Sequence, residues 1–306
     1  EALELARELV NAAEAALAVA EVDTAGSAPT ARELVNAAEA ALAAADVDTP
    51  RLDAELLLAY VLDCTRPRLV TSLAATVDVE QARRFHRLVV RRERREPVAY
   101  ITGWKGFRGI ELNVDERVLI PRPETELLVA VVKADRPHSV LDVATGSGAV
   151  ALALADELPD AGVVATDVSP DALAVAAANA ERLGLADRVT LVRSDLLSEV
   201  NGTFDAIAAN LPYVPSREID GLQPEIAFEP RAALDGGADG LDLVRELALQ
   251  VRARGTLKAG GLIALEIGDD QGPAAARLLA DAGFAVAAIH QDLNGRDRVV
   301  AARAPR

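Results

Sequence analysis

The sequence is poor in the residues that build redox and metal centres. It has 306 residues and one cysteine, Cys64, which excludes an internal disulfide, and we interpret this thiol as a buried structural residue. Its three histidines, His86, His138 and His290, lie far apart, so no metal-ligand spacing occurs and we predict no metal site. Aromatic residues make up only 3% of a chain that is 51% hydrophobic, so the core must consist mostly of Ala, Val and Leu.

Long apolar runs and a surplus of positive charge are also missing. No stretch of about 18 uncharged apolar residues and no signal-peptide pattern occurs, so we predict no membrane partner and a cytoplasmic location. The net charge of −16 would repel phosphate backbones, which argues against general nucleic-acid binding but leaves room for a local basic patch. The sequence carries no signal for an oligomeric state.

A repeat marks the start of the chain. The segment ARELVNAAEAALAVAEVDT at 6–24 returns almost unchanged at 31–49, and only the second copy continues directly into another helical pattern, PRLDAELLLAYVL. We therefore predict that residues 1–30 are a duplicated extension without a role of their own and that residues 31–96 form a small helical domain. The last helix of that domain carries seven arginines within 83–95, which is typical either of a solvated helix face or of a docking surface for an acidic partner.

The character of the chain changes after residue 96. Residues 97–120 combine β-branched and aromatic residues with three glycines, a pattern typical of a β-hairpin that links two domains. Residues 121–306 begin with a helix and then alternate strands with helices, which indicates a mostly parallel sheet covered on both faces. A short connection joins the last two predicted strands, 285–293 and 297–304, so one of them must run antiparallel. The sequence therefore predicts an α/β fold with a mixed sheet.

In such a sheet, ligands bind beyond the carboxyl ends of the strands, and three of these ends carry suggestive residues. In DVATGSGAV, Gly146 and Gly148 would let the backbone approach a ligand, and the following helix offers free N–H groups. Asp167 ends the next strand and could accept both hydroxyls of a ribose, and Asp195 is placed to meet an adenine amino group. Turn glycines, a helix cap made by Asp167 with Ser169, and a surface aspartate are the ordinary alternatives. Together the three sites favour adenosine binding.

The fourth strand end, AANLPYVP at 208–215, indicates the chemistry. Hydride transfer would need a His or Lys as proton donor or acceptor, and none occurs there. Methyl transfer to a planar nitrogen needs that nitrogen held in line with the methyl group. The Asn210 side-chain oxygen and the Leu211 carbonyl could accept its two N–H groups, Pro212 would stiffen the turn, and Tyr213 could stack on the flat substrate group.

A linked set of motifs resembles a known family over roughly residues 31–303. LIPRPETELL, LDVATGSGAVALALA, ANLPYVP and EPRAALDGGADGLDL together resemble the peptide chain release factor glutamine methyltransferases of the HemK/PrmC type. The Gly-rich loop is common to many methyltransferases, whereas PRPETE and EPRAALDGGADGLD are more specific. The resemblance implies a class I, Rossmann-like methyltransferase domain with a seven-strand mixed sheet, preceded by a helical substrate-recognition domain and a β-hairpin linker.

The resemblance also implies a reaction in translation termination. The methyl donor would be S-adenosylmethionine, and the acceptor would be the side-chain amide nitrogen of the glutamine in the Gly-Gly-Gln loop of class 1 release factors. The residues implied to bind the donor are Ala144, Thr145, Gly146, Ser147, Gly148, Asp167, Asp195, Leu196 and Asn210. Those implied to hold the glutamine are Asn210, Leu211, Pro212 and Tyr213.

Three departures from the family pattern keep alternatives open. Leu211 stands where the family usually has proline, Ala144 where it has glycine, and Leu196 where an aromatic residue often stacks. Asn-Leu-Pro-Tyr also occurs in rRNA adenine dimethyltransferases, although those usually have a different first loop and a basic surface. An rRNA or nucleic-acid adenine N6-methyltransferase is therefore one alternative, and a catalytically impaired binding protein with a methyltransferase fold is another.

Overall fold

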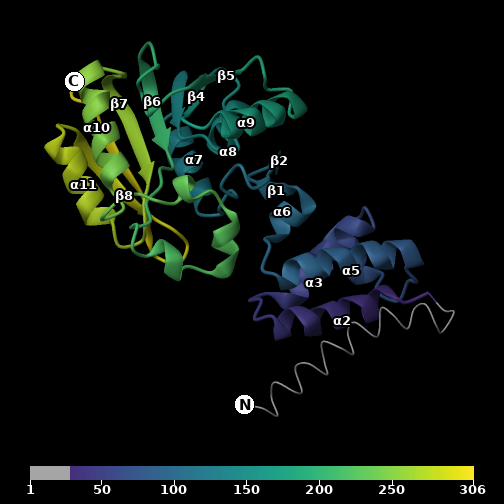
Figure 1. Ribbon diagram of the computed structural model, residues 1–306. Helices are drawn as coiled ribbons and strands as arrows, with labels where there is room; N and C mark the ends of the chain where they lie inside the picture. Colours follow the sequence, from purple (N-terminus) through teal and green to yellow (C-terminus); the bar gives the residue numbers. More distant parts are fainter. Residues whose placement is uncertain (1–27) are drawn as a thin grey trace. The chain divides into compact units, whose positions relative to one another are not determined.

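The protein, described by a computed structural model over residues 28–306, consists of two compact units (Figure 1). The first unit ends at Gly103 and the second runs from Trp104 to Arg306, so the division falls inside the range 97–120. All but the last three residues of the segment interpreted as a duplicated extension lie outside the described residues. In the part of the chain that is described, no helix is long and apolar enough to cross a membrane.

The first unit is a bundle of helices around an aliphatic core. Leu42 of the first described helix and Leu57 and Leu58 of the next are fully buried there, and Phe85 and Val89 join them. Ala, Leu and Val therefore supply most of this core, with one aromatic ring. The helices are α2 (Ala31–Ala44), α3 (Pro50–Val61), α4 (Arg66–Thr71), α5 (Val79–Glu93) and α6 (Val98–Thr102).

A capping box fixes the start of α2. The Thr30 hydroxyl accepts a hydrogen bond from the Glu33 backbone N–H at 3.3 Å, and the Glu33 carboxylate accepts one from the Thr30 N–H at 2.8 Å. Thr30 also forms a β-bridge with Thr76. Residue 30, which the sequence assigns to the extension, therefore belongs structurally with α2.

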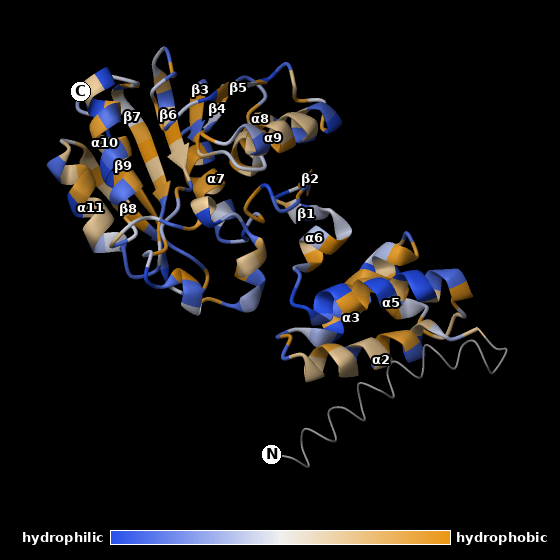
Figure 2. Ribbon diagram, in the orientation of Figure 1, coloured by the Kyte–Doolittle hydropathy of each residue, from blue (hydrophilic) through white to orange (hydrophobic). Residues whose placement is uncertain are grey.

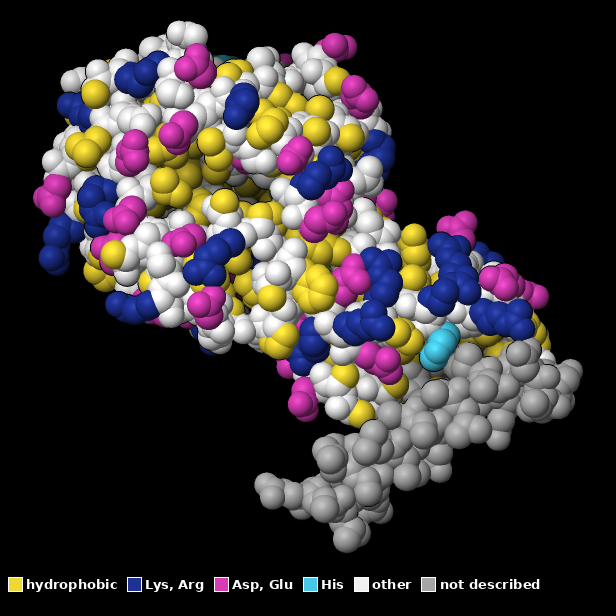
Figure 3. All heavy atoms as spheres, viewed as in Figure 1, with side chains coloured by type: hydrophobic (Ala, Val, Ile, Leu, Met, Phe, Trp, Pro, Cys, Tyr) yellow, Lys and Arg dark blue, Asp and Glu magenta, His cyan; other side chains and the backbone are white. Residues whose placement is uncertain are grey.

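The arginines at 83–95 divide into structural and exposed residues. Arg92 is buried and forms an ion pair with Asp53 of α3, with 2.7 Å between Nε and Oδ2. Arg91 pairs with Glu96, and Arg95 donates to backbone carbonyls that follow α2. Figure 3 shows Lys and Arg side chains gathered over the part of the first unit that contains α3 and α5. The exposed arginines of the range are Arg83, Arg84, Arg87 and Arg94.

The second unit contains a hairpin and a seven-stranded sheet. The hairpin pairs β1 (Trp104–Phe107) with β2 (Ile110–Asn113). In the sheet, the strands follow the order β5-β4-β3-β6-β7-β9-β8. Strand β9 is antiparallel to both of its neighbours, and the remaining pairs are parallel, which confirms the predicted mixed sheet. The sheet strands are β3 (Ser139–Val143), β4 (Gly162–Asp167), β5 (Val189–Arg193), β6 (Phe204–Ala209), β7 (Leu257–Glu266), β8 (Ala285–Gln291) and β9 (Asp297–Arg303).

Helices pack on the sheet and leave its central strands buried. Leu247 and Leu279, from the last two helices, share a core cluster with Ile263 and Leu265 of β7. Figure 2 shows the central strands mostly in hydrophobic colours, as expected for parallel strands covered on both faces. The helices of this unit are α7 (Thr125–Ala134), α8 (Ala149–Glu157), α9 (Pro170–Arg182), α10 (Asp242–Arg254) and α11 (Gly272–Asp281), with 3-10 turns at Ile219–Gly221, Pro224–Phe228 and Arg231–Ala233.

Polar contacts join the hairpin to the rest of the second unit. The Arg108 guanidinium, at the hairpin turn, forms an ion pair with Glu157 at the end of α8. Asn179 of α9 is fully buried, accepts from the Asn113 N–H at 2.7 Å and donates to the Asn113 and Ser147 carbonyls. One buried amide thus joins the hairpin to the glycine-rich loop after β3.

Candidate active site

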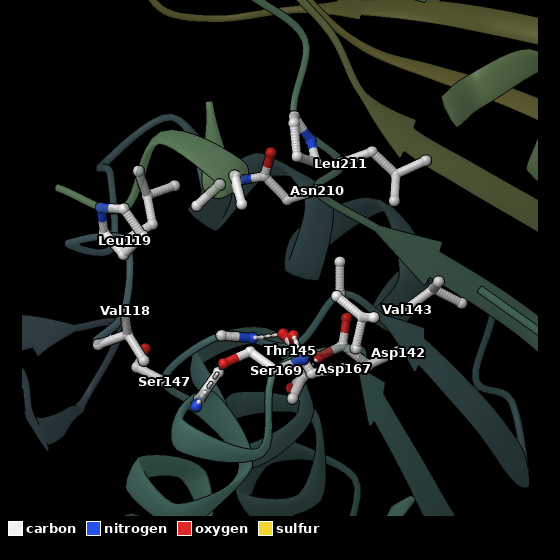
Figure 4. Close-up of a pocket in the computed structure, with 18 of the residues that line it drawn as sticks. Val118, Leu119, Asp142, Val143, Thr145, Ser147, Asp167, Ser169, Asn210 and Leu211 are labelled. Atoms are coloured by element: carbon white, nitrogen blue, oxygen red, sulfur yellow. Dashed lines mark hydrogen bonds between the residues drawn. The ribbon is translucent and has the colours of Figure 1, made fainter. Parts of the chain in front are cut away.

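A cavity lies at the carboxyl edge of the parallel strands in the second unit. Figure 4 shows Asn210 and Leu211 on one side of it, Asp167 and Ser169 on the opposite side, and Leu119 on a third. Space-filling atoms show hydrophobic side chains around a hollow in this unit (Figure 3). Of the predicted site residues, the cavity brings together Ala144, Thr145, Gly146, Ser147, Asp167, Asp195, Leu196, Asn210, Leu211 and Pro212. Gly148 and Tyr213 are not among its lining residues.

The loop after β3 turns sharply into the cavity. Ala144 and Gly146 both have left-handed backbones, with φ of 61° and 56°. The Thr145 N–H donates to the Thr166 carbonyl of β4 at 2.8 Å, and the Thr145 hydroxyl donates to the Asp142 carboxylate at 2.6 Å. These bonds hold the loop against the ends of two strands, so its backbone presents a fixed surface to the cavity.

Gly148 has a backbone conformation and a packing environment that favour glycine. It is the N-cap of α8, with a left-handed φ of 86°. A Cβ at this position would lie 2.9 Å from the Leu152 side chain and 3.3 Å from Ala176. Packing therefore accounts for this glycine, and the approach of its backbone to a ligand stays a prediction.

Asp167 joins two loops at the end of β4. Its Oδ2 accepts from the Gly146 N–H and its Oδ1 from the Ser169 N–H, both at 2.9 Å. Each carboxylate oxygen can accept more than one hydrogen bond, so the group keeps capacity toward the cavity. The Ser169 hydroxyl, which accepts from the Ala172 N–H at 3.2 Å, caps α9. Capping is therefore the function of Ser169, and Asp167 is left to face the cavity.

Asp142 is a lining acid that the sequence analysis missed. It lies in β3 and is 1% exposed, and burial raises its pKa to about 7. Its Oδ2 accepts from the Thr145 hydroxyl and from the Ala151 N–H at 3.2 Å. The sequence did carry a signal for it, namely a single acid within the apolar strand SVLDV. Burying a carboxylate costs free energy unless other groups compensate for it, so such an acid is rarely present without a role.

Asp195 and Leu196 form the wall beyond β5. The Asp195 N–H donates to the Ser198 hydroxyl at 3.2 Å, and its side chain is exposed at the cavity. Leu196 has a φ of 47° and is 7% exposed, and it both lines the cavity and belongs to the hydrophobic core cluster. An acidic acceptor therefore stands next to an apolar surface.

Two oxygen acceptors lie side by side in sequence after β6. The Asn210 side-chain nitrogen donates to the Thr125 hydroxyl at 3.2 Å, which leaves its amide oxygen for the cavity. The Leu211 carbonyl accepts no hydrogen bond from the backbone of residues 28–306. The Leu211 side chain is 2% exposed and anchors the turn in the hydrophobic core.

The rest of this turn is clamped by its neighbours. The Tyr213 carbonyl accepts from the Gln271 side-chain amide at 2.9 Å. A Cβ at Gly236 would lie 2.5 Å from the Pro212 carbonyl, so the loop at 235–240 can approach the turn this closely only with glycine there. The Tyr213 hydroxyl donates to Glu266 at 3.5 Å, away from the stacking position that the sequence suggests for it.

An ion pair that the sequence analysis missed supports the opposite wall. Glu229 has a side chain that is 1% exposed, pairs with Arg122 and accepts from the Ile120 N–H at 3.1 Å. It thereby joins the segment PRPETE to EPRAAL, and both flank the cavity. The pairing could not be read from the sequence because the partners are 107 residues apart.

The chemistry of the cavity fits S-adenosylmethionine. Asp167 would hold the ribose hydroxyls, Asp195 the adenine amino group, and the loop 144–147 the amino-acid end of the molecule. When bound, this donor supplies an electrophilic methyl group on a sulfonium. Among residues 28–306, no group of three or more His, Cys, Asp or Glu side chains could hold a metal ion.

Two family models and several known relatives match this protein over most of the chain. A family model described as "PrmC N-terminal domain" matches residues 33–103, and one described as "Methyltransferase small domain" matches residues 123–237. A release factor glutamine methyltransferase of Moorella thermoacetica is 46% identical, with 81% of this chain and 89% of that protein covered. The enzyme of the same name from Caulobacter vibrioides is 43% identical, with 82% and 88% covered.

A solved structure, the ribosomal protein L11 methylase of Lactobacillus delbrueckii subsp. bulgaricus, matches with a TM-score of 0.46 and 25% identity over 64% of this chain and 86% of that one. The sequence relatives decide the assignment, because their similarity extends through both units. The protein is an S-adenosylmethionine-dependent methyltransferase, and the chain belongs to the release factor glutamine methyltransferase family.

Proposed function

We propose that this protein transfers a methyl group from S-adenosylmethionine to the side-chain amide nitrogen of the glutamine in the Gly-Gly-Gln loop of class 1 release factors, in the cytoplasm. One observation supports an amide nitrogen as the group that receives the methyl. The Asn210 oxygen and the Leu211 carbonyl are two free acceptors at a cavity whose opposite side carries Asp167. A primary amide presents two N–H groups in one plane and matches this pair.

The two hydrogen-bond acceptors, the Asn210 oxygen and the Leu211 carbonyl, compensate for the low nucleophilicity of an amide nitrogen. Its nitrogen lone pair is delocalised into the carbonyl, so the nitrogen must be oriented and made richer in electrons before it reacts. Hydrogen bonds from both N–H groups to fixed oxygens do this without rearrangement during the reaction. With the donor bound, the oriented nitrogen would take its methyl group, the carbon–sulfur electron pair would stay on sulfur, and the nitrogen would release one proton to water.

Residues on the other side of the cavity would position the methyl donor. We assign the loop 144–147, Asp167, Asp195 and Leu196 to this task, because all of them line the cavity at the ends of β3, β4 and β5. Asn210 lies between the two groups and would meet both the donor and the acceptor. Tyr213 and Pro212 would act by holding the turn, since Tyr213 does not line the cavity.

The proposal is tested by labelling and mapping. The purified protein is incubated with methyl-labelled donor and a class 1 release factor, and the labelled residue is located by mass spectrometry. The matched control is the same release factor with its Gly-Gly-Gln glutamine replaced by alanine, which should take up no label. A parallel reaction contains rRNA. Label on rRNA adenine and none on the release factor would assign the protein to the adenine methyltransferases instead.

A further inference from the structure

The turn after β6 changes from free to bound carbonyl oxygens along its length. Within the described part of the chain, the Leu211 carbonyl accepts no backbone hydrogen bond. Two residues later, the Tyr213 carbonyl accepts from the side-chain amide of Gln271, with 2.9 Å between the oxygen and Nε2. The Val214 carbonyl then accepts from the Gly236 N–H at 2.9 Å. The acceptor at the cavity therefore lies directly before a stretch whose carbonyls are held by other loops.

The amide of Gln271 joins this turn to two further loops. Gln271 is the N-cap of α11 and is 7% exposed. Its Nε2 donates to the Tyr213 carbonyl and also to the Asp239 carbonyl at 3.3 Å, while its Oε1 accepts from the Gly268 N–H at 2.8 Å. Because a backbone N–H can only donate, Gly268 fixes which end of the amide carries the oxygen. The NH2 group is thereby directed at the two carbonyls.

Two glycines let the loop at 235–240 come close enough to share this amide. Gly240 has a left-handed φ of 77°, and a Cβ there would lie 2.2 Å from the Tyr213 carbonyl oxygen and 2.5 Å from Gln271 Nε2. A Cβ at Gly236 would lie 2.5 Å from the Pro212 carbonyl oxygen. Only glycine fits between backbone atoms at these separations. The motif DGGADG therefore packs against the turn as its support.

We propose that Gln271 is a positioning residue for the methyl transfer, because it holds the Tyr213 carbonyl in the interior and thereby keeps the Leu211 carbonyl directed at the substrate amide. This inference rests on the proposed function, which assigns the Leu211 carbonyl to one N–H group of the glutamine. The ring of Pro212 fixes its φ, so few backbone angles separate the two carbonyls and a displacement of one is passed to the other. Without the Gln271 NH2 group, the carbonyl oxygens of Tyr213 and Asp239 would have no hydrogen-bond donor between them and would repel each other.

The first test is the rate of a single turnover at saturating methyl donor and release factor. Gln271→Met keeps a long unbranched side chain but has no N–H group, so the rate should fall by about 10-fold or more, as expected when an orienting group is displaced. Gln271→Glu turns a carboxylate oxygen toward the two carbonyls and should be slower still. The affinity for the methyl donor, measured by calorimetry, should be unchanged, because the residues assigned to it lie at the ends of β3, β4 and β5.

Arg188→Met is the matched control for a loss of structure. Arg188 also donates to two backbone carbonyls of the second unit, those of Leu158 at 2.9 Å and Ala161 at 3.0 Å. It directly precedes β5 and so lies at the amino edge of the parallel strands, away from the cavity. Its replacement should lower the free energy of unfolding in urea and leave the single-turnover rate unchanged. A Gln271→Met enzyme as fast as Arg188→Met would overturn the inference.

The second test needs neither methyl donor nor substrate. The chain has two Leu-Pro peptide bonds, at 158–159 and 211–212. With 13C at leucine carbonyls and 15N at proline, only these two bonds give a carbon–nitrogen correlation in the NMR spectrum, and Pro159→Ala assigns them by removing one. Gln271→Met should shift the signal of the bond at 211–212 and leave the other in place. Arg188→Met should do the reverse, since the Leu158 carbonyl loses its hydrogen bond.

The two tests distinguish the inference from the proposed function. An unshifted signal of the bond at 211–212 in Gln271→Met, or a wild-type transfer rate in that variant, would overturn the inference and leave the function standing. Failure of the wild type to label release factor, with this signal still shifted by Gln271→Met, would overturn the function and leave Gln271 as a support of the turn alone.

Discussion

At the residue scale, Asn210 combines two hydrogen-bonding tasks in one amide. Its nitrogen is used by Thr125 and its oxygen is left for the substrate. We therefore expect Asn210→Ala to slow methylation of release factor by about 100-fold or more, the scale of removing one oriented polar group from a preorganised site. The single-turnover rate at saturating donor measures this.

A matched variant separates the oxygen from the rest of the side chain. Asn210→Asp keeps an acceptor oxygen but has no N–H for Thr125, so its rate should lie between those of wild type and Asn210→Ala. Donor affinity, measured by calorimetry, should change little in either variant. An Asn210→Ala enzyme that methylates release factor at the wild-type rate would show that a hydrogen bond from the substrate amide to Asn210 is not part of the mechanism.

Ala144 carries a backbone conformation that suits glycine better. Its φ of 61° is left-handed, which costs an L-residue about 1–2 kcal/mol, while glycine loses about 0.5–1 kcal/mol more entropy on folding. Ala144→Gly should therefore raise the free energy of unfolding by about 0.5–1 kcal/mol in urea. As a control, Ala174→Gly on the exposed face of α9 should lower it by about 1 kcal/mol. A destabilised Ala144→Gly would mean that the methyl group has packing partners that outweigh the strain.

Local patterns predict the residues at strand ends better than the residues that support them. Asp167 and Asn210 could be placed because each directly follows an apolar strand and the carboxyl ends of parallel strands meet at one edge. Thr125 could not, because its hydrogen bond to Asn210 joins α7 to the end of β6, two elements that are far apart in the chain. Leu211 was interpreted as a substitute for a turn proline, whereas its side chain is also buried in the core.

At the element scale, α5 offers a basic surface of which only part is available to a partner. Arg91, Arg92 and Arg95 bind groups within their own unit, so reversing their charge would disturb the fold. Arg87 is exposed and forms an ion pair with the exposed Glu80 at 3.4 Å, an interaction worth little in water. Arg87 is therefore a suitable probe of docking.

We expect Arg87→Glu to slow association with an acidic surface of the release factor several-fold, most strongly at low salt. The rate constant for association, measured by stopped-flow at two ionic strengths, reports this. Reversal of the exposed Arg277 on α11 is the control for the change in net charge. Equal association rates in both variants would leave α5 as a solvated helix face.

The hydrophobic pattern of the sequence predicts where a strand begins, except where a polar contact extends the strand beyond its apolar run. The sequence predicts the strand now called β7 from Gly261, where the apolar run begins, but the strand starts at Leu257. Lys258, which interrupts the pattern, pairs with Asp205 of the neighbouring β6 at 2.8 Å and so continues the strand along the sheet.

At the scale of the whole molecule, two buried acids link stability to pH. Asp142 and Glu266 have pKa values raised to about 7 by burial, well above those of the unfolded chain. A group of this kind stabilises the fold fully below its unfolded pKa and loses this contribution as pH rises through its folded pKa. Glu157 acts oppositely, because the hydrogen bond from Arg108 lowers its pKa to about 2, so its contribution is lost only in strong acid. Stability of the second unit should therefore be greatest near pH 4, fall as pH rises, and level off above about pH 7.

The fall is large enough to measure. A shift of two to three pKa units corresponds to about 3 kcal/mol for each buried acid at pH 8. Trp104 is the chain's one tryptophan and belongs to the second unit, so its fluorescence in urea follows the unfolding of that unit. Glu266→Gln removes one of the two titrations and should reduce the decline between pH 5 and 8 by about half. A wild-type unit whose stability rises steadily over this range would show that both acids ionise well below neutrality.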